Sequence, residues 1–449
     1  MTRTQSPIIM KFGGTSLGSG ERITNAAQIV ATRKTQNPVL ATSAMSQITN
    51  TLIATAEAAL TRKESTVRKN LKLIRAQHFT VAKRENTRTE IEKLIQKLEY
   101  LCEGILMIGE LSPRSLDLIS SYGERMSSWL MVEALESIGL KAQRFDSQDL
   151  IQTNDSFGNA EVEWKTTTRQ IKKALEPAIK KGIIPVVTGY IGSTKNGETT
   201  TLGRGGSDYS AAILGVSLNA AEIQIWTDVD GMMTADPRVV STAKMLPQVS
   251  FQEAAELAYF GAKVLHPKTI QPAVESNIPV RILNTMNPKS TGTTIVKSSP
   301  TTKNTIKAIA SKKNISIINI CSTRMFGPFG FLARIFNTFA KHEVSVDVVA
   351  TSEVSVSVTV EDGSFSKELI RDLEKFSNTK VTRNQTLISV VGNGLKDDYR
   401  VEAQVFQALA KAKISNELIS KGASQINLTF LVPTKNAERT VKTLHEALF

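Results

Sequence analysis

Residues 199–208 read TTTLGRGGSD. They follow the apolar run Ile183–Val187 and precede the apolar segment Tyr209–Leu214, which together predict a strand, a polar loop and a helix. The glycines let a backbone approach a ligand closely, and a helix that begins just after them offers N–H groups and a positive dipole end to an anion. Arg204 adds a fork of donors that suits a carboxylate or a phosphate. The stretch therefore predicts a site for an anionic small molecule.

The start of the expected helix has two candidate caps, Ser207 and Asp208. The loop matches neither the P-loop pattern nor the G-x-G-x-x-G pattern, and its glycines would also suit an ordinary surface turn. The rest of the chain has to decide between these interpretations.

Composition narrows the class of protein. The chain has 449 residues, enough for two or three domains, and a formal net charge of +13. Its Lys and Arg residues are spread along the whole length, which favours a solvated basic surface over a nucleic-acid site. Cys102 and Cys321 form no disulfide framework or metal motif, as expected in a reducing cytoplasm. The four histidines are scattered, so no histidine metal site is expected, and neither a signal peptide nor a membrane span is apparent.

The opening of the chain resembles a ligand-binding βα unit. The strand-like run Ile8–Phe12 ends at Gly13-Gly14, and Glu21–Arg33 follows with helical spacing. Lys11 lies at the carboxyl end of the strand, where open α/β sheets bind ligands. A surface lysine is the alternative, but a lysine in an apolar strand beside two glycines favours a functional role.

Strands and helices alternate over the first two thirds of the chain, which argues for one parallel, doubly wound α/β domain. Further strands are expected at 39–44, 141–145, 183–187, 221–227 and 279–283, the last of this region. Helices are expected over 51–111, 121–138, 166–181 and 251–259, and from Pro267. Glu124 falls in a first helical turn, where the dipole favours a carboxylate even without a functional role. Residues 287–294 and 298–302 are rich in turn formers and predict a linker.

The remaining residues predict two α+β modules of the order strand–helix–strand–strand–helix–strand. The first has strands at 315–320, 344–349 and 354–360 and helices at 330–342 and 366–376. The second has strands at 387–391, near Ile414 and at 425–432, and helices at 401–412 and 437–448. A short strand at 306–310 could belong to the second module.

Taken together, these motifs resemble the aspartokinase family. The resemblance rests on five segments in the same order: 11–16, 199–208, 226–228, 236–240 and 260–267. The C-terminal pair resembles two ACT regulatory modules, and residues 325–332 and 345–354 are most similar to the lysine-sensitive, plant-type branch. The resemblance implies an amino-acid-kinase-type αβα sandwich with a mostly parallel sheet over residues 1–298. Ferredoxin-like ACT modules at 312–385 and 386–449 would follow.

The implied reaction transfers the γ-phosphoryl group of ATP to the side-chain carboxylate of L-aspartate. It gives 4-phospho-L-aspartate in the first step of lysine, threonine, methionine and diaminopimelate synthesis, with lysine as the expected feedback inhibitor. A carboxylate with a pKa of about 3.9 is already ionised at neutral pH, so the reaction needs no general base. It does need cations and backbone donors that bring two anions into line.

The resemblance also assigns residues to roles. The catalytic residues are Lys11, Lys263 and Asp208. The aspartate-binding residues are Ser43, Thr49, Glu124 (for the ammonium), Arg204 (for a carboxylate) and Ser207. The ATP-binding residues are Lys11, Phe12, Gly13, Gly14, Thr227, Asp228, Met233, Arg238 and Lys263, with Gly13 and Gly14 donating N–H groups to the phosphates. The effector-binding residues are Met325, Phe331, Leu332, Val346, Asp347, Ser352 and Glu353.

The expected cofactor is Mg²⁺, carried with ATP by phosphates and water, so no protein ligand is assigned to it. The resemblance implies a cytoplasmic homodimer or dimer of dimers formed through the ACT modules, with no nucleic-acid or membrane partner. Two departures from the family pattern concern binding. Met233 replaces a tyrosine near the adenine, and Gly327-Pro328-Phe329 replaces the His-Ser-Arg of some bacterial relatives.

Four alternatives remain. Another amino-acid or carbamate kinase would usually lack the C-terminal modules, and Glu124 argues for a substrate with an ammonium group. The lysines at 11 and 263 argue against a catalytically silent amino-acid sensor. An RNA-binding protein would need a basic patch interleaved with aromatic residues, which the sequence lacks. The ACT pair could also dimerise without binding a ligand.

Overall fold

The computed structural model describes residues 6–261, 265–298, 306–322, 329–395, 398–421 and 426–449. The predicted site residues Lys263 and Met325 lie outside these ranges. The chain forms two compact units. Unit 1 comprises Met1–Met232, Pro247–Phe251 and Val264–Ser298, and unit 2 comprises Met233–Leu246, Gln252–Lys263 and Ser299–Phe449.

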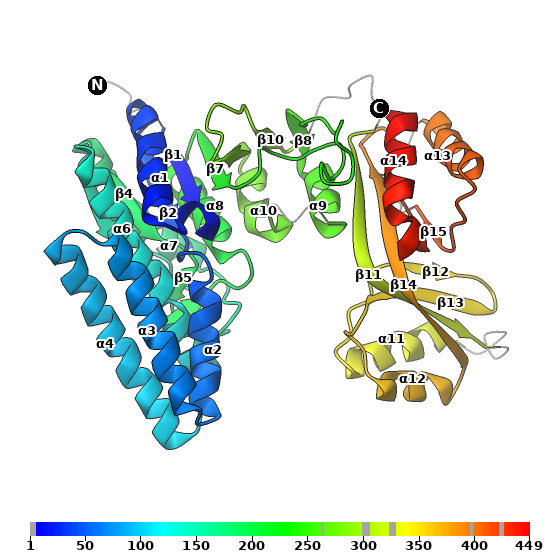
Figure 1. The fold of residues 1–449 in the computed structure, drawn as a ribbon, viewed down its shortest axis with the longest axis horizontal. Coiled ribbons are helices and arrows are strands. Elements are labelled where there is room, and N and C mark those ends of the chain that lie inside the picture. Colours follow the sequence, from blue (N-terminus) through cyan, green and yellow to red (C-terminus); the bar gives the residue numbers. More distant parts are fainter. Residues whose placement is uncertain (1–5, 262–264, 299–305, 323–328, 396–397, 422–425) are drawn as a thin grey trace. The chain divides into compact units, whose positions relative to one another are not determined.

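Unit 1 is built on an eight-stranded sheet whose strand order is β3-β4-β2-β1-β7-β9-β10-β8 (Figure 1). The strands are β3 (Ala142–Phe145), β4 (Ile184–Thr188), β2 (Pro38–Thr42), β1 (Ile8–Phe12), β7 (Glu222–Thr227), β9 (Val280–Asn284), β10 (Thr293–Val296) and β8 (Gln248–Ser250). The first six are parallel, whereas β10 runs antiparallel to β9 and parallel to β8. The central strands β2 and β4 are apolar and buried throughout, as expected for a sheet covered on both faces.

Helices cover both faces of this sheet, which confirms the predicted αβα sandwich. Contacts place α7 (Trp164–Lys180), α8 (Gly206–Leu218) and α10 (Pro267–Glu275) together on the sheet, and α1 (Gly20–Thr32) with α6 (Tyr122–Ser137). The polar segment 51–111 was expected to be helical, and it forms α2 (Ile48–Leu60), α3 (Glu64–Val81) and α4 (Glu85–Ile108), followed by α5 (Pro113–Ser120).

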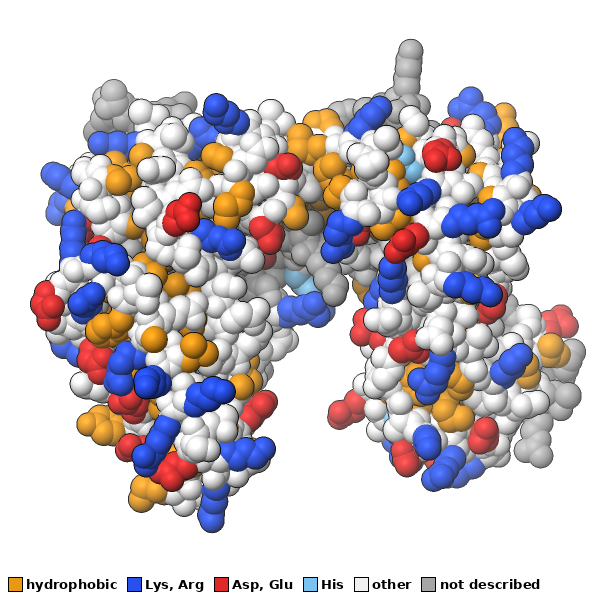
Figure 2. Space-filling view, in the orientation of Figure 1, with side chains coloured by type: hydrophobic (Ala, Val, Ile, Leu, Met, Phe, Trp, Pro, Cys, Tyr) orange, Lys and Arg blue, Asp and Glu red, His pale blue; other side chains and the backbone are white. Residues whose placement is uncertain are grey.

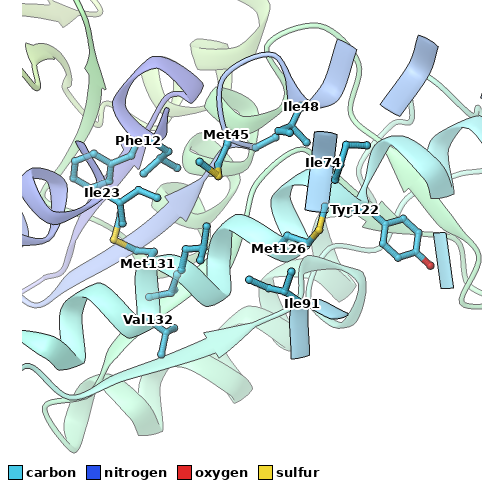
Figure 3. Close-up of a cluster of buried hydrophobic side chains, with 14 of the residues drawn as sticks. Phe12, Ile23, Met45, Ile48, Ile74, Ile91, Tyr122, Met126, Met131 and Val132 are labelled. Atoms are coloured by element: carbon cyan, nitrogen blue, oxygen red, sulfur yellow. The ribbon is translucent and has the colours of Figure 1, made fainter. Parts of the chain in front are cut away.

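One continuous apolar core joins the sheet to helices α1 to α6. Figure 3 shows Phe12 of β1 in the same cluster as Ile23 of α1, Met131 of α6 and Ile74 of α3. The apolar spacing of the helices thus serves to bury β1, and with it the strand end that carries Lys11.

Three local predictions for unit 1 were wrong. Thr293 and Thr294 were expected in a linker but begin β10 (Thr293–Val296), which pairs with β9 on one side and with β8 on the other. Residues 199–201 were expected in a loop but form β6 (Thr199–Thr201), which pairs with β5 (Ile191–Ser193). Neither Ser207 nor Asp208 caps α8, because its N-cap is Gly205 at φ +71° with no side-chain hydrogen bond.

Unit 2 is built on a six-stranded antiparallel sheet whose strand order is β12-β13-β11-β14-β16-β15. The strands are β12 (Val349–Thr351), β13 (Ser355–Glu361), β11 (Ala308–Cys321), β14 (Asn378–Val391), β16 (Asn427–Pro433) and β15 (Ile419–Ser420). Four helices lie near the two ends of the long strands in Figure 1: α11 (Phe331–Lys341), α12 (Lys367–Glu374), α13 (Tyr399–Lys411) and α14 (Ala437–Leu448).

The two ACT-type modules share the long strands β11 and β14. Residues Ala308–Lys312 pair with Leu387–Val391, and the other end of β11, up to Cys321, pairs with β14 as far as Asn378. The register shifts between Lys312 and Ile317 separate the two ends. One end forms an apolar core with α13 and α14, and the other forms a separate core with α11 and α12. The predicted strand at 306–310 therefore pairs beside the second module.

Two strand predictions for unit 2 were misplaced. A strand was expected at 344–349, but β12 begins at Val349, because the N–H of Asp347 already bonds to Thr359 and holds the preceding residues in an irregular path. A strand was expected near Ile414, but that residue closes the end of α13 by donating its N–H to Leu409, and β15 lies at Ile419–Ser420.

Two stretches expected in the catalytic domain belong to unit 2. Residues 233–246 place Ala235 and Val240 in the apolar core of the second ACT-type module. The helix α9 (Phe251–Tyr259) also lies in this unit from Gln252 onward.

Among the residues the structure describes, no helix is both long and apolar enough to span a membrane. The face drawn in Figure 2 carries Lys and Arg side chains interspersed with acidic ones, without a continuous basic patch. The positive charge on this face is therefore dispersed, as the sequence suggested.

Candidate functional site

The carboxyl ends of the central strands meet at one edge of the sheet in unit 1. Register pairs Phe12 of β1 with Thr42 of β2 and with Trp226 of β7, and Thr42 in turn with Thr188 of β4. The residues that follow these strands, among them Gly13, Ser43 and Gly189, therefore open onto a common edge. This is where ligands bind in open α/β sheets.

Lys11 and Asp208 form the charged centre of this edge. The Nζ atom of Lys11 lies 2.6 Å from Oδ1 of Asp208, and their side chains are only 12% and 10% exposed. Asp208 comes from the first turn of α8, so the pair joins β1 to the segment quoted at the outset. With so little water around it, this ion pair holds the lysine ammonium in a fixed place.

Gly13 and Gly14 lead into a short 3₁₀ helix, η1 (Gly14–Leu17). A Cβ atom on Gly13 would lie 3.6 Å from the Lys11 Nζ, so the ammonium lies beside the glycine backbone. The N–H of Gly13 already donates to the carbonyl of Trp226 at 3.1 Å. The N–H of Gly14 is therefore the donor expected for a phosphate, rather than the N–H groups of both Gly13 and Gly14.

Glu124 is buried, with 3% of its surface exposed. Burial raises the pKa of its carboxyl to about 8. Hydrogen bonds from the backbone of Ala44 and Glu124, together with the charge of Lys11, oppose this rise. A Cβ atom on Gly123 would lie 2.6 Å from that of Ala44, so the glycine lets the turn after β2 lie directly on α6. One oxygen of Glu124, Oε2, has no protein partner.

The loop 203–206 is shaped by glycine at two positive φ angles. Gly203 and Gly205 have φ of +75° and +71°, and a Cβ on Gly205 would lie 2.9 Å from Thr269. Arg204 between them is exposed. Within the described ranges Arg204 forms no ion pair. Burial lowers the pKa of His266, and the charge of Arg204 lowers it further. Arg204 is thus a free cation at the loop that leads into α8.

The remaining predicted aspartate-binding residues border the same edge. Ser43 donates its N–H to Phe12 and accepts a hydrogen bond from Ser127 at its carbonyl, which fixes its position after β2. Thr49 lies half-buried in the first turn of α2. Ser207 is buried, and a Cβ on Gly189 would come within 2.8 Å of its hydroxyl.

The predicted ATP-binding residues are divided between the units. Thr227 ends β7 at the common edge, and its hydroxyl is 3.2 Å from Oδ1 of the exposed Asp228. Met233 and Arg238 belong to unit 2. There Arg238 pairs with Asp236 at 2.7 Å while remaining largely exposed.

Most of the predicted effector residues lie in the first ACT-type module. Phe331 packs edge-on against Phe376, Leu332 is exposed, and Val346 contacts the module's core. Ser352 and Glu353 are exposed beside β12. Asp347 differs from these residues, because both of its oxygens are engaged by other side chains.

Sequence reasoning missed two residues that support the site, the buried Asp117 and the partly buried Tyr190. Asp117 of α5 accepts hydrogen bonds from Gly158 and from both the N–H and the hydroxyl of Thr201. Burial raises its pKa, and those bonds oppose the rise. Tyr190 adopts φ +69° just after β4, and its ring would touch a Cβ on Gly206. Neither residue lies in a motif, although a carboxyl in an apolar helix was a weak signal for Asp117.

The arrangement can hold two anions close together. A fixed ammonium, a free guanidinium, backbone N–H groups and a helix N-terminus converge on the strand ends, while the buried carboxyl of Glu124 offers a place for a cation. His266 lies beside Gly205 at this loop, and burial, with the charges of Arg204 and Lys268, lowers its pKa. The chemistry is that of a group transfer between anions, driven by charge neutralisation and alignment.

Comparison with known proteins identifies relatives of both units. The model of the amino acid kinase family matches residues 6–284, and that of an ACT domain matches residues 318–367 and 388–448. The chain is 40% identical to chloroplastic aspartokinase 3 of Arabidopsis thaliana, over 100% of this chain and 82% of that protein. It is 38% identical to lysine-sensitive aspartokinase 3 of Escherichia coli, over 98% of this chain and 99% of that protein.

Two crystal structures of aspartokinase III from E. coli are similar over nearly the whole chain. Both are 37% identical to it and cover 99% of this chain and 100% of theirs. The R-state complex with aspartate and ADP matches with a TM-score of 0.83. The T-state complex with lysine and aspartate matches with a TM-score of 0.86.

Proposed function

Since this chain belongs to the amino acid kinase family, and within it to the aspartokinases, we propose which of its residues carry out the family's reaction. The chain transfers the γ-phosphoryl group of ATP to the side-chain carboxylate of L-aspartate and forms 4-phospho-L-aspartate. This is the first step toward lysine, threonine, methionine and diaminopimelate. The observation that supports our assignment best is the half-enclosed Lys11–Asp208 pair beside the glycine turn of β1.

Lys11 neutralises the phosphates of ATP, and Asp208 keeps its ammonium aimed at them. The N–H of Gly14 and the first turn of η1 donate to the same phosphates. Lys263 supplies the second ammonium in our proposal. Two cations of this kind lower the repulsion between the nucleotide and the incoming carboxylate, which is the main obstacle to this transfer.

Aspartate binds on the other side of this centre. Arg204, which has no other partner among the described residues, takes a substrate carboxylate in a forked pair. Glu124 takes the ammonium, and its unpartnered oxygen supports that role. Ser43, Thr49 and Ser207 complete the pocket with hydroxyl groups. The carboxylate that attacks the γ-phosphorus needs no base, because it is already ionised.

The residues that we assign to the nucleotide are Phe12, Gly13, Thr227, Asp228, Met233 and Arg238. The described residues contain no group of three or more His, Cys, Asp or Glu side chains that could hold a metal ion. We propose that Mg²⁺ arrives with ATP, held by its phosphates and water, and that it would supply further positive charge there.

Lysine is the proposed effector of the ACT pair. Support comes from the lysine-sensitive E. coli relative and from its structure with lysine and aspartate bound together. The contacts proposed are Met325, Phe331, Leu332, Val346, Asp347, Ser352 and Glu353. We also propose a cytoplasmic enzyme, because Cys102 and Cys321 are free thiols, and a dimer or dimer of dimers formed through these modules. The proposed domain limits are 1–298, 312–385 and 386–449.

The activity is tested by incubating the chain with ATP, Mg²⁺ and single amino acids in the presence of hydroxylamine, which traps an acyl phosphate as a hydroxamate. Aspartate should give ADP and hydroxamate in equal amounts. Formation of ADP without hydroxamate, or faster turnover with another amino acid, would refute the assignment.

A further inference from the structure

Asp347 of the first ACT-type module lies at the centre of a small cluster. Its Oδ2 accepts from the Nζ of Lys312 at 2.9 Å, and its Oδ1 accepts from the hydroxyl of Tyr259 at 2.6 Å. The Lys312 ammonium also lies 2.9 Å from Glu361 and 5.1 Å from the centre of the Tyr259 ring. We call Asp347, Lys312 and Tyr259 the Asp347 cluster. The side chains of Asp347 and Lys312 are 7% and 19% exposed, whereas Tyr259 is 45% exposed, so the ion pair is shielded from water and the tyrosine borders the solvent.

The cluster joins the regulatory sheet to helix α9, which carries Tyr259. Two other residues of α9 are tied to the same sheet: Glu253 accepts from the N–H of Asn393, and Glu256 accepts from the amide of Asn427. Positions 253, 256 and 259 follow one another at a spacing of three, so they share a face of the helix.

The end of this face is also in close contact with the sheet. A Cβ atom on Gly261 would lie 2.4 Å from the carbonyl of Ser311, the residue before Lys312. Helix α9 therefore has little room to shift along the sheet while the cluster is intact.

We propose that Tyr259 and Lys312 are positioning residues through which the occupancy of Asp347 controls the kinase. Lys312 holds the place of an effector ammonium at Asp347, and Tyr259 connects that carboxylate to α9. Lys263, one of the two ammonium groups assigned to phosphoryl transfer, follows Tyr259 by four residues in the sequence. A change at Asp347 is therefore passed to the nucleotide side of the reaction.

The inference rests on the proposed role of lysine as the effector at Asp347. Because both carboxylate oxygens already have partners, an incoming ammonium has to compete with Lys312 or Tyr259 for the same acceptor. The effector ammonium takes the place of Lys312 and also draws the Asp347 carboxylate away from the Tyr259 hydroxyl, so α9 loses one of its ties to the sheet.

The test uses the full chain and two substitutions. Lys312→Met removes the competing ammonium and keeps most of the apolar stem, so the dissociation constant of lysine measured by calorimetry should fall about three- to tenfold. Tyr259→Phe keeps the ring but frees Asp347, so kcat/KM for ATP without lysine should fall about three- to tenfold while KM for aspartate stays unchanged. Saturating lysine should then inhibit this variant much less than the unchanged chain.

The matched control is Lys313→Met, which removes the neighbouring lysine, paired at 3.1 Å with Glu438 on an exposed surface. Its lysine affinity and kinetics should equal those of the unchanged chain. An unchanged or higher lysine dissociation constant in Lys312→Met would overturn the competition. Unchanged kinetics of Tyr259→Phe without lysine would overturn the link to α9. If lysine does not bind the unchanged chain, its proposed role as effector fails, and the Tyr259→Phe kinetics still decide whether Tyr259 positions the catalytic side.

Discussion

Replacing Glu124 with Gln should abolish a pH dependence that its environment creates. Burial raises the pKa of this carboxyl to about 8 from 4.5, so at pH 7 only about a tenth of the molecules carry the charge that the substrate ammonium needs. Apparent aspartate affinity should therefore rise as the pH rises. We expect KM for aspartate to fall about tenfold from pH 6 to 7, about fivefold more from pH 7 to 8, and little above pH 8.5.

Glu124→Gln keeps the size of the side chain and cannot ionise. Its KM for aspartate should be flat between pH 6 and 8.5 and should exceed that of the unchanged chain by tenfold or more at pH 8.5. The assay is initial-rate kinetics with saturating ATP, which separates KM from kcat. A steep fall of KM with pH in the Gln variant would show that another group titrates, and equal KM values at pH 8.5 would place the ammonium elsewhere.

The free energy of unfolding provides a second test of the Glu124 pKa, and this test does not depend on substrate. Because the folded pKa lies above the unfolded one, the protonated carboxyl stabilises the fold, and this contribution is lost as the pH rises from about 4.5 through about 8. A difference of about 3.5 pH units at 1.36 kcal/mol per unit corresponds to about 5 kcal/mol. Urea unfolding of the two proteins should show the unchanged chain losing stability relative to the Gln variant over this window. A constant difference would mean that Glu124 is not held in an apolar site.

Three further substitutions test the frame of the site. Lys11→Met should lower kcat by about 10²- to 10³-fold in steady-state assays and leave the circular dichroism spectrum intact, although the buried Asp208 loses its partner; near-normal turnover would contradict its role. Gly205→Ala should destabilise the fold by about 1–3 kcal/mol in urea unfolding, because the position has φ +71° and Thr269 lies 2.9 Å from the new Cβ, and a neutral result would mean that the loop adapts. Asp117→Asn should cost about 1–3 kcal/mol by the same measurement, since it cannot accept from all three of its donors, and unchanged stability would show that the neighbouring strand is held otherwise.

The sequence allowed the architecture of unit 1 to be predicted because its signals are local. The apolar strand before Gly13 and the helical spacing after it need no distant partner to be recognised. β10 was missed because its pairing depends on β8 and β9: Thr294 pairs with Gln248 and with Arg281, and the sequence of neither strand indicates that register. The same applies to β11, where only the completed sheet shows that one strand supports two modules.

Motifs allowed individual candidate residues to be singled out, but they did not indicate the contacts or the pKa values of those residues. Lys11 and Asp208 were both singled out, yet only the fold brings them within 2.6 Å of each other. The sequence indicated Glu124 as a first-turn carboxylate, whereas its raised pKa follows from burial under the turn after β2. Tyr190 and Asp117 escaped notice because a left-handed φ and a buried hydrogen-bond acceptor depend on tertiary packing.

The residues that we assign to aspartate all belong to a single unit. Ser43, Glu124 and Arg204, assigned to aspartate, all lie in unit 1, so their relative positions depend on the kinase sheet alone.

Residues 233–246, which include two that we assign to the nucleotide, differ from the aspartate-binding residues, because apolar side chains of this segment belong to the core of the second ACT-type module. Thr234 bonds to His445 of α14 and its carbonyl accepts from Ile309 of β11, so the segment that contains Met233 and Arg238 is anchored on the ACT-type sheet. Any rearrangement of that sheet reaches these residues through direct contacts. Lysine should therefore act on kcat and KM for ATP more than on KM for aspartate, and inhibition that is purely competitive with aspartate would contradict this division.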